Sequence, residues 1–255
     1  MALEPRPSID LNADVGEGFG VWWAPDDALL GHVSSASVAC GFHAGDARIM
    51  RRTCAAAAAA GTRIGAHVGY QDLAGFGRRE LGIAPDRLAD DVVYQLGALA
   101  ACARAEGAAV RYVKPHGALY HRCGRDEAAA SAVAAAVRAV DPGLGMMGPP
   151  GSALLAAATG AGLATLAEGF ADRRYAPDGT LVSRSETGAV LSRDEAVRQA
   201  LSIALEGRAH AAGGEAVAVR VASLCVHGDT PGAAETAAAL RAALEAAGVR
   251  VQPPA

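Results

Sequence analysis

The sequence predicts an α/β fold in which a parallel sheet closes into a single barrel. Short runs of apolar and β-branched residues alternate with Ala-rich stretches about seven times along the 255 residues. That alternation is typical of βα units, in which a crossover helix returns the chain to the next parallel strand. No stretch has the composition of a linker, so one domain over residues 1–255 is expected. A barrel is its simplest closure, and a doubly wound open sheet is the alternative.

The strands and helices are expected in strict alternation. The expected strands are Ile9–Ala13, Ser35–Ala39, Arg63–His67, Val110–Lys114, Leu144–Met147, Thr165–Glu168 and Val217–Val226. The expected helices cover residues 45–60, 86–106, 126–139, 151–159, 193–207 and 231–247. Helix-end signals support three of these helices, because Gly is favoured just after a helix and Pro in its first turn. The signals are Gly61, Gly107, and the set Asp229, Thr230, Pro231 and Gly248 around the last helix.

The segment Ala171–Glu186 fits neither pattern. It contains Ala176-Pro177-Asp178-Gly179, a sequence typical of a tight turn. We therefore expect a turn-bearing insertion there, which could form a small hairpin flap over residues 171–186.

Composition excludes several classes of function. The formal net charge of −4 gives no basic footprint for nucleic acid. No run of about 18 strongly apolar residues occurs, so no membrane span is expected. Met1–Ser8 lacks the layout of a signal peptide. The five cysteines, an odd number without CxxC spacing, indicate reduced thiols and a cytoplasmic location. The sequence leaves the oligomeric state open, a homo-oligomer included.

Polar and glycine-rich segments follow most of the expected strands. In a parallel barrel the carboxyl ends of the strands share one face, so these segments could line one pocket. Five of the seven histidines lie within or beside them, and this coincidence is stronger than any one residue. The segments are residues 12–18, 40–46, 66–72, 114–117, 168–173 and 227–230, and the histidines are His43, His67, His116, His121 and His227.

Lys114 is the one lysine of a chain that has 22 arginines. A cation that stays Lys against such a bias is expected to need a compact ammonium on a flexible stem, which a guanidinium does not provide. Chance retention at a strand end is the alternative. The neighbouring Pro115-His116-Gly117 favours a functional role for Lys114.

The acidic residues after the first two strands each have two interpretations. Asp14 and Glu17 could bind a cation or divide acid and base duties. They could also hydrogen-bond a loop or face solvent. Asp46, with His43, could instead cap the helix that begins near Gly45, where a carboxylate is favoured by the helix dipole.

The histidines and cysteines also have structural alternatives. His67 and His116 could be core histidines that hydrogen-bond to the backbone. Cys40 lies close to His43, which permits a thiolate nucleophile, but a free Cys is commonly a small buried side chain. Cys54, Cys102 and Cys225 are interpreted as core residues.

A metal ion is left open by the pattern. Asp and His at strand ends are the type of ligand set with which barrel deacetylases hold a divalent ion that activates water. The candidate ligands are Asp14, His43 and His67, although there is no HExxH and no tight Cys/His spacing. Gly16-Glu17-Gly18-Phe19-Gly20 matches neither a dinucleotide fingerprint nor a Walker loop, so a nucleotide site would need another architecture.

Six segments resemble the LamB/YcsF family. The resemblance runs from residue 10 to about residue 230, and several of the matching blocks are long and unusual. It implies a distorted seven-stranded (β/α) barrel of the glycoside hydrolase/deacetylase type. The segments are Asp10–Glu17, Ala39–Asp46, Gly65–Tyr70, Val113–Tyr120, Glu168–Tyr175 and His227–Asp229.

The resemblance also implies an activity, the ATP-dependent opening of 5-oxo-L-proline to L-glutamate. It further implies two partner subunits, PxpB-like and PxpC-like, and ATP with Mg2+ as the source of the phosphoryl group. The absent Walker loop leaves two arrangements: ATP binds in an unfamiliar cleft of this chain, or the partners carry out the phosphorylation. The second is favoured here.

On this activity, roles can be assigned as hypotheses. Lys114 would stabilise an anionic oxygen or phosphoryl group, and Asp14 or Glu17 would act as general base. His43, His67 or His116 would serve as acid or orient the water. The expected substrate-binding residues complete the site: Asn12, Asp46, Glu168, Asp172, Arg173, His227 and Asp229.

Two other functions remain compatible with the sequence. One is a metal-dependent amidase or carbohydrate deacetylase on a similar barrel. The other is a non-catalytic subunit that binds a small amide and regulates its partners. The concentration of ionisable residues at the strand ends favours an enzyme.

Overall fold

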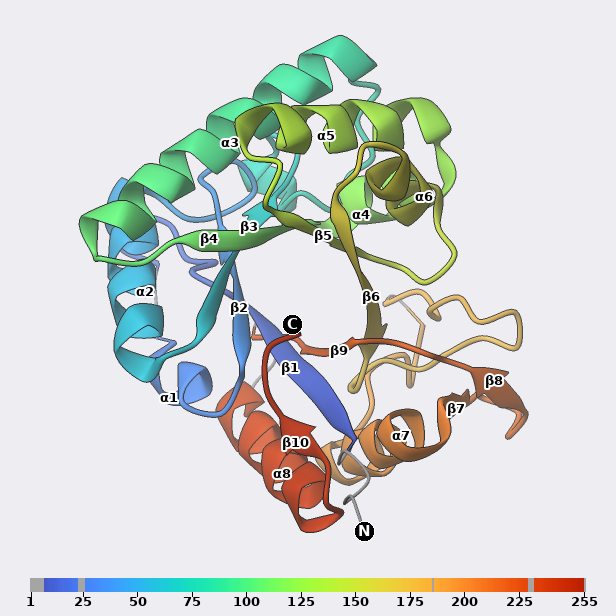
Figure 1. Cartoon of the computed structure of the whole chain (residues 1–255). Coiled ribbons are helices and arrows are strands. Elements are labelled where there is room, and N and C mark those ends of the chain that lie inside the picture. The colour runs from blue at the N-terminus through green and yellow to red at the C-terminus, as the bar shows by residue number, and fades with distance from the viewer. Residues whose placement is uncertain (1–6, 23–25, 185, 229–231, 255) are drawn as a thin grey trace, which may run out of the picture.

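A closed barrel of seven parallel strands forms the centre of the molecule. The computed structural model describes residues 7–22, 26–184, 186–228 and 232–254. The barrel order is β1-β2-β3-β4-β5-β6-β9, and β9 pairs again with β1 to close the ring (Figure 1). The strands are β1 (Ser8–Val15), β2 (Ser35–Ala39), β3 (Arg63–Val68), β4 (Val110–Pro115), β5 (Gly145–Gly148), β6 (Ala164–Phe170) and β9 (Ser223–Val226). The predicted barrel is confirmed, and the open-sheet alternative is wrong.

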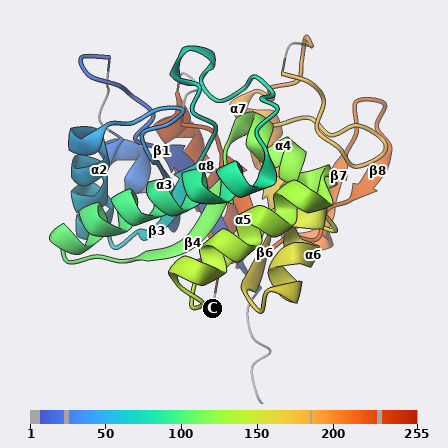
Figure 2. The same ribbon diagram turned by 90° about the horizontal axis from the view of Figure 1, so that it is seen from above.

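Helices surround the barrel on its outer side. They are α1 (Asp27–Leu30), α2 (Ala47–Ala60), α3 (Pro85–Ala105), α4 (Gly117–Arg125), α5 (Glu127–Val140), α6 (Ala153–Gly160), α7 (Arg193–Glu206) and α8 (Ala233–Ala246). A short 3-10 turn, η1 (Leu73–Gly75), follows β3. The long loops after β1, β3 and β6 rise on one side of the barrel, and the carboxyl end of the chain lies on the other (Figure 2).

Local sequence signals end the helices where expected. Asp46 caps α2, because its Oδ1 accepts hydrogen bonds from the backbone N–H of Arg48 and Ile49, both at 2.9 Å. Gly61 ends the same helix in the left-handed conformation, with φ of +70°. Gly248 follows α8. The expected N-terminal signals of α8, Asp229, Thr230 and Pro231, lie outside the described residues.

The expected strand Val217–Val226 is wrong as a single element. The structure divides it into β8 (Ala216–Ala218) and β9, with an irregular stretch between them. β8 pairs antiparallel with β7 (Arg208–His210) outside the barrel. The apolar alternation continues through the break without Gly or Pro, so the sequence carries no signal for it.

Several further elements were not expected: the short α1, η1 and β7, and also α4 and β10. α4 begins at Gly117, directly after the end of β4, where no helix was expected. β10 (Arg250–Val251) adds one short parallel pairing to the beginning of β1. All five cysteines are free thiols. Within the part of the chain that the structure describes, no helix is long and apolar enough to cross a membrane.

The segment after β6 folds back on itself. Tyr175 and Leu181 form an antiparallel bridge, and the backbone N–H of Ala176 donates to the carbonyl of Thr180 at 2.8 Å. Gly179 has φ of +86°, a conformation that glycine adopts without steric cost. This segment thereby brings its side chains to the loop side of the barrel.

The barrel separates apolar from polar side chains by the two-residue period of its strands. In β1 the odd-numbered residues, such as Leu11 and Ala13, belong to the apolar core between the barrel and the helices. The even-numbered Asp10, Asn12 and Asp14 are buried as well, but they contact polar side chains of other strands. The interior of this barrel is therefore polar, and it leads up to the loop side.

Candidate functional site

A cavity of about 510 Å3 opens at the carboxyl ends of the strands. Such a volume is typical of small-molecule sites, which span ~300–1,000 Å3. The residues that line it come from distant parts of the chain, because the ends of parallel strands meet on one face. They include Asp14 after β1, His67 at β3, Lys114 at β4, Phe170 at β6 and His227 after β9.

Lys114 lies at the bottom of this cavity among acceptor atoms. Its Nζ is 2.8 Å from Asp14 Oδ1 and 2.7 Å from Glu168 Oε1. Asn12 Oδ1 and Cys225 Sγ each lie 3.3 Å from the same nitrogen. An ammonium has three N–H donors, so these four neighbours use its full capacity.

The charges on Lys114 and its neighbours determine the protonation states of Lys114 and Asp14. Burial disfavours the Lys114 ammonium, but Asp14, Cys225 and Glu168 outweigh burial and hold its pKa well above the usual value. Burial likewise opposes the Asp14 carboxylate, yet His67 and Lys114 hold its pKa well below the usual range. The site therefore holds a charged ammonium on Lys114 beside an ionised carboxylate on Asp14.

Asn12 links this group to the floor of the barrel. Its Nδ2 donates to Glu168 Oε1 at 3.0 Å and to Ser223 Oγ at 2.7 Å. The Ser223 hydroxyl in turn donates to Asp10. These side chains are fully buried, and the network fixes Glu168 from below.

His227 and Asp172 form a second pair at the rim. His227 Nδ1 lies 2.9 Å from Asp172 Oδ1, and the backbone N–H of His227 donates to Oδ2 at 3.1 Å. Because a carboxylate only accepts, His227 carries its proton on Nδ1 and leaves Nε2 with a lone pair. Gln199 of α7 holds the segment that carries Asp172, because its Nε2 donates to the backbone carbonyls of Phe170 and Arg173 on either side.

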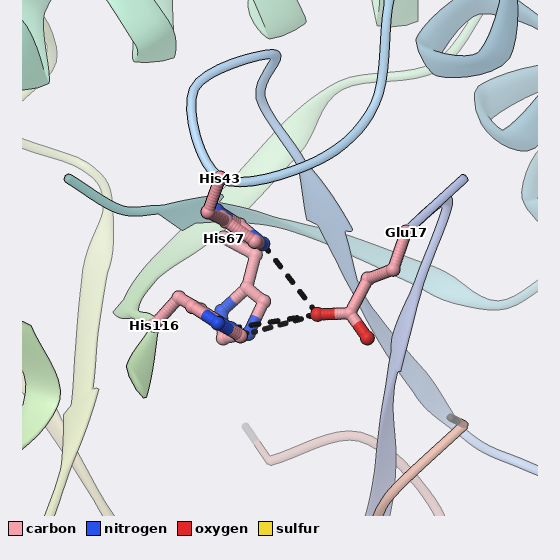
Figure 3. Close-up of side chains that lie close together, drawn as sticks. All are labelled: Glu17, His43, His67 and His116. Atoms are coloured by element: carbon pink, nitrogen blue, oxygen red, sulfur yellow. Dashed lines mark hydrogen bonds and ion pairs between the residues drawn. The ribbon is translucent and has the colours of Figure 1, made fainter. Parts of the chain in front are cut away.

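Three histidines and a glutamate form a cluster on the other side of the cavity. Glu17 Oε1 lies 3.5 Å from His43 Nε2, 3.9 Å from His67 Nε2 and 3.4 Å from His116 Nδ1 (Figure 3). His116 Nδ1 is 3.0 Å from His67 Nε2. The His43 and His116 rings stack with centroids 3.7 Å apart. We call these four residues the histidine cluster.

The histidine cluster contacts the Lys114 group, which is Lys114 with Asn12, Asp14, Glu168 and Cys225, through His67. His67 Nε2 lies 3.3 Å from Asp14 Oδ2, and the other Asp14 oxygen binds Lys114. Burial and the neighbouring His116 and His67 lower the pKa of His43 well below its usual value. Burial, followed by His67, lowers the pKa of His116 to about 3. These two imidazoles are therefore neutral near neutral pH.

Arginine side chains make the outer part of the cavity basic. Arg78, Arg125, Arg173 and Arg184 all line it. Arg173 is 6% exposed, and its Nη2 donates to the carbonyl of Val182 at 2.6 Å. Its Nε has no hydrogen-bond partner among the residues that the structure describes. Burial and the nearby Arg184 lower the pKa of Arg173, so an anion placed here would be favoured.

The structure brings most of the expected site residues together. Those that line the cavity are Asp14, Glu17, His67, Lys114, His116, Arg173 and His227. Asn12, Glu168 and Asp172 are buried directly behind them and bind them. His43 is fully buried behind His116, against which it stacks. Asp229 lies outside the described residues.

Asp46 is not at the cavity. Both of its oxygens accept backbone hydrogen bonds, Oδ1 at the start of α2 and Oδ2 from Gly20 at 2.9 Å. The structural alternative, a helix cap, thus accounts for this residue. A cap and a binding residue have the same sequence pattern here, because both lie between a strand end and a helix.

The roles of two cysteines differ from each other. Cys40 is buried, and its thiol donates to the carbonyl of Val38 at 3.2 Å. Burial raises the pKa of the Cys40 thiol, which disfavours a thiolate nucleophile. Cys225 is fully buried in a small core cluster with Tyr120 and Phe170, as interpreted from the sequence, and its Sγ in addition contacts Lys114 Nζ at 3.3 Å. The sequence signal for this contact was the position of Cys225 on β9, two residues before His227.

Other cavity residues were missed by sequence reasoning. They are Arg78, Glu80, Tyr120, Arg125 and Arg184. Tyr120 and Arg125 belong to α4, which was not expected, and the others lie on loops far from a strand end. Their positions depend on how the loops fold over the barrel, and the strand-end rule does not extend to them.

Comparison with known proteins gives consistent results. The LamB/YcsF family model matches residues 9–255. A protein of Nocardia farcinica that is named as a 5-oxoprolinase subunit is 57% identical over 96% of this chain and 98% of its own length. The crystal structure of a lactam utilization protein from Thermus thermophilus has a TM-score of 0.91 and 45% identity, covering 96% of this chain and 99% of that one.

A more distant structural similarity supports the fold type alone. The peptidoglycan deacetylase PdaC of Bacillus subtilis has a TM-score of 0.50 with 10% identity, covering 97% of this chain and 87% of that chain. The predicted deacetylase-type barrel is thereby confirmed as an architecture.

Proposed function

The chain belongs to the LamB/YcsF family, and we propose that it is one of the subunits of a 5-oxoprolinase that opens the lactam ring of 5-oxo-L-proline to give L-glutamate. The observation that carries the proposal is a sequence identity of 57% and 58%, over nearly the full length of the chain, to proteins that are named as 5-oxoprolinase subunits. The cavity at the strand ends supports it, because its groups match the needs of this reaction.

The reaction sets four requirements for the site. The substrate carboxylate must be bound, a water molecule must lose a proton, the carbonyl oxygen must be stabilised as it gains charge, and the ring nitrogen must receive a proton. Water adds its oxygen to the carbonyl carbon, the C–N bond breaks, and an amine and a carboxylate result. ATP transfers its γ-phosphoryl group to the otherwise unreactive lactam oxygen and leaves as ADP, so that C–N cleavage gives an acyl phosphate, which a second water hydrolyses to the carboxylate and inorganic phosphate.

We assign the water-activating base to His227. Its Nδ1–H is held by Asp172 at 2.9 Å, so its Nε2 lone pair is fixed in orientation. One ring nitrogen of His227 and one oxygen of Asp14 lie within 4.8 Å of each other and of Cys225 Sγ. A water molecule that gives its proton to His227 would therefore sit close to the Asp14 carboxylate, which stabilises the resulting imidazolium.

The anionic parts of the substrate are assigned to the arginines. Arg173 offers an Nε donor that lacks a partner among the described residues, and Arg184 lies close enough to depress its pKa. A planar guanidinium with free donors suits a carboxylate or a phosphoryl group. We therefore orient the substrate carboxylate or the transferred phosphoryl group towards Arg173.

Lys114 receives a different role from the one the sequence suggested. Its ammonium is already bound by Asp14 and Glu168 at 2.8 and 2.7 Å. Because two carboxylates already compensate its charge, the ammonium has little capacity left to stabilise an oxyanion. We propose that Lys114 positions Asp14 and keeps it ionised.

We also propose that the phosphoryl transfer is shared with two partner subunits. The chain has no Gly-Lys-Ser/Thr loop to bind the phosphates of ATP with Mg2+. The relatives are named as one subunit of an enzyme, which supports an assembly of several chains. The use of ATP agrees with the predicted cytoplasmic location.

Reconstitution tests this proposal. The chain is mixed with its PxpB-like and PxpC-like partners, 5-oxoproline and ATP, and glutamate is measured while each component is omitted in turn. We expect glutamate from the complete mixture only, and little 5-oxoproline-dependent ATP hydrolysis from this chain alone. Robust ATP hydrolysis by the isolated chain would refute the shared division of labour, and full activity without this chain would refute its catalytic part.

Two adjacent arginines provide a matched test of substrate binding. Arg173→Lys removes the partnerless Nε donor, whereas Arg174→Lys changes a side chain that binds Gly188 and Glu195 away from the cavity. We expect Arg173→Lys to raise the KM for 5-oxoproline about tenfold, which corresponds to the loss of one charge-assisted hydrogen bond. Arg174→Lys should leave KM unchanged. Equal KM values for the two variants would contradict the assignment.

A metal-dependent amidase is the second candidate. The observation that favours it is the histidine cluster, whose nitrogens and carboxylate gather beside the cavity. This candidate predicts hydrolysis of a simple amide or an acetylated sugar without ATP. Assay of the isolated, metal-supplemented chain with such substrates separates the two, because the 5-oxoprolinase proposal expects no turnover there.

A further inference from the structure

The hydrogen bonds of His116 fix the position of its proton. His116 Nε2 lies 2.8 Å from the backbone carbonyl of Phe76, a group that can only accept. The neutral ring therefore carries its proton on Nε2, and Nδ1 keeps a lone pair. That lone pair points to His67, whose Nε2 is 3.0 Å away.

His67 has the opposite tautomer for the same reason. Its Nδ1 lies 3.1 Å from the backbone carbonyl of Lys114, so this nitrogen is the donor. In the neutral ring, Nε2 therefore carries a lone pair. With both rings neutral, two nitrogen lone pairs face each other at a hydrogen-bond distance, an arrangement that is repulsive unless a cation lies near both, either a metal ion or a proton on His67 Nε2.

His43 adds a second observation of the same kind. It is fully buried, and neither of its ring nitrogens hydrogen-bonds to any residue that the structure describes. A buried imidazole without a partner costs roughly 1–3 kcal/mol. Its Nε2 points towards Glu17 at 3.5 Å, as Figure 3 shows. One nitrogen of each histidine and one Glu17 oxygen therefore lie within 4.8 Å of one another.

The spacing of these atoms matches a metal coordination sphere. In a tetrahedral site with bonds of about 2.0–2.1 Å, neighbouring ligand atoms are about 3.4 Å apart. His67 Nε2 and His116 Nδ1 are 3.0 Å apart, and Glu17 Oε1 lies 3.4 Å from His116 Nδ1 and 3.9 Å from His67 Nε2. The carboxylate contributes the negative charge that a divalent ion needs.

We propose that His67 Nε2, His116 Nδ1 and Glu17 Oε1 bind one divalent transition-metal ion. All three residues line the cavity, so a fourth coordination position faces it. Three protein ligands and one open position are typical of a catalytic site rather than a structural one. Two imidazoles favour zinc or a neighbouring transition metal over magnesium, which prefers oxygen ligands.

His43 and Asp14 are placed outside this core set for geometric reasons. The His43 ring is parallel to that of His116, with an interplanar angle of 5°, so one ion cannot lie in both ring planes. His43 would have to tilt before it could bind. Asp14 has one oxygen bound to Lys114, and only Oδ2, at 3.3 Å from His67 Nε2, faces the cluster. The core set therefore differs from the expected ligands Asp14, His43 and His67.

The backbone around the histidine cluster holds the imidazole rings in a fixed orientation. Both core histidines donate their second N–H to a backbone carbonyl, the arrangement that orients metal-binding histidines. Gly69 and Gly77 lie so close that an added Cβ would be 2.6 Å from His43 Nδ1 and 2.8 Å from His116 Cδ2. Gln95 holds Gly69 in place by accepting from its N–H and donating to its carbonyl.

The test measures binding of Co2+, whose visible absorption reports coordination by nitrogen. The full chain is stripped with a chelator, checked for its fold by circular dichroism, and titrated with Co2+, with calorimetry in parallel. We expect saturable binding of one ion per chain and a d–d absorption band. His116→Gln and Glu17→Gln should each weaken binding at least tenfold. His210→Gln, on the exposed β7, removes one imidazole elsewhere and should leave binding unchanged.

Several results would overturn the inference. Absence of the band in folded wild-type protein would do so. So would equal losses in His116→Gln and His210→Gln, which would show non-specific binding. Loss on His227→Gln with retention in His116→Gln would place the ion at Asp14, Cys225 and His227 instead. The titration needs neither 5-oxoproline nor partner subunits, so its outcome is independent of the proposed function.

Discussion

The Lys114 ammonium and the histidine cluster lie side by side at the mouth of the barrel, yet the ammonium and the facing imidazoles are satisfied to very different degrees, although Glu168 Oε2 behind Lys114 has no hydrogen-bond partner among the described residues. Lys114 Nζ has four acceptors within 3.3 Å, and its charge is compensated by Asp14 and Glu168. In the histidine cluster, two lone pairs face each other and His43 lacks a hydrogen bond to any described residue. A closed network holds residues in place, whereas an open one is suited to receive a ligand.

The largest expected effect comes from removing the Lys114 ammonium from between its two carboxylates. Lys114→Met would leave Asp14 and Glu168 buried without their cation, which should cost about 3–5 kcal/mol of stability and abolish glutamate formation. Urea unfolding measures the change.

A double variant separates charge compensation from side-chain packing. Lys114→Met with Glu168→Gln removes one of the two stranded charges and should recover part of the lost stability. If Lys114→Met alone unfolded at the wild-type urea concentration, the Lys114 group would not be the closed network described above.

The histidine cluster should respond to a change in its backbone support. Gly77→Ala would place a Cβ 2.7 Å from His43 Cβ at φ of +63°, so we expect about 1–3 kcal/mol of destabilisation and weaker Co2+ binding. Gly97→Ala is the control, because Gly97 lies within α3 with nothing within 4 Å of its added Cβ. That change should stabilise the protein by up to about 1 kcal/mol and leave Co2+ binding alone. Undiminished Co2+ affinity in Gly77→Ala would argue against the assigned ligands.

The smallest effect on stability, but a clear one on turnover, is expected at Asp172. Asp172→Asn removes the negative charge and one of the two accepting oxygens beside His227 and should lower kcat about 10²-fold with a smaller change in KM. A change in KM alone would assign Asp172 to binding instead.

The same variant has a defined pH dependence. Burial opposes the Asp172 carboxylate, but His227 outweighs it and lowers the pKa of Asp172. Its contribution to stability is therefore present above the unfolded pKa of about 3.9 and is lost as pH falls through the lower folded pKa. The difference in unfolding free energy between wild type and Asp172→Asn should shrink below about pH 4, and a constant difference down to pH 2 would contradict this.

Much of the barrel could be predicted because βα alternation is visible in the sequence. The expected Ser35–Ala39 coincides with β2, and most other strands differ by one or two residues at an end. The break between β8 and β9 could not be predicted, since the apolar pattern continues through it. α4 was missed because it begins without a loop, directly after β4.

The site could be predicted to the extent that it depends on strand ends. Asp14, His67 and Lys114 lie at strand ends, and the closure of the barrel places Asp14 3.3 Å from His67 and 2.8 Å from Lys114. The pairing of His67 with His116 through opposite tautomers could not be predicted, because it depends on the carbonyls of Lys114 and Phe76. Arg184 belongs to a loop whose path over the cavity no local pattern specifies.

The most direct test of this contrast is the protonation of the two facing histidines. Two-bond 1H–15N correlation spectra of the metal-free protein at neutral pH distinguish the Nδ1–H and Nε2–H tautomers of each ring. The account predicts Nδ1–H for His67 and Nε2–H for His116, with both facing nitrogens unprotonated. A proton found on His67 Nε2 or His116 Nδ1 would show that the cluster satisfies itself, and would contradict the account.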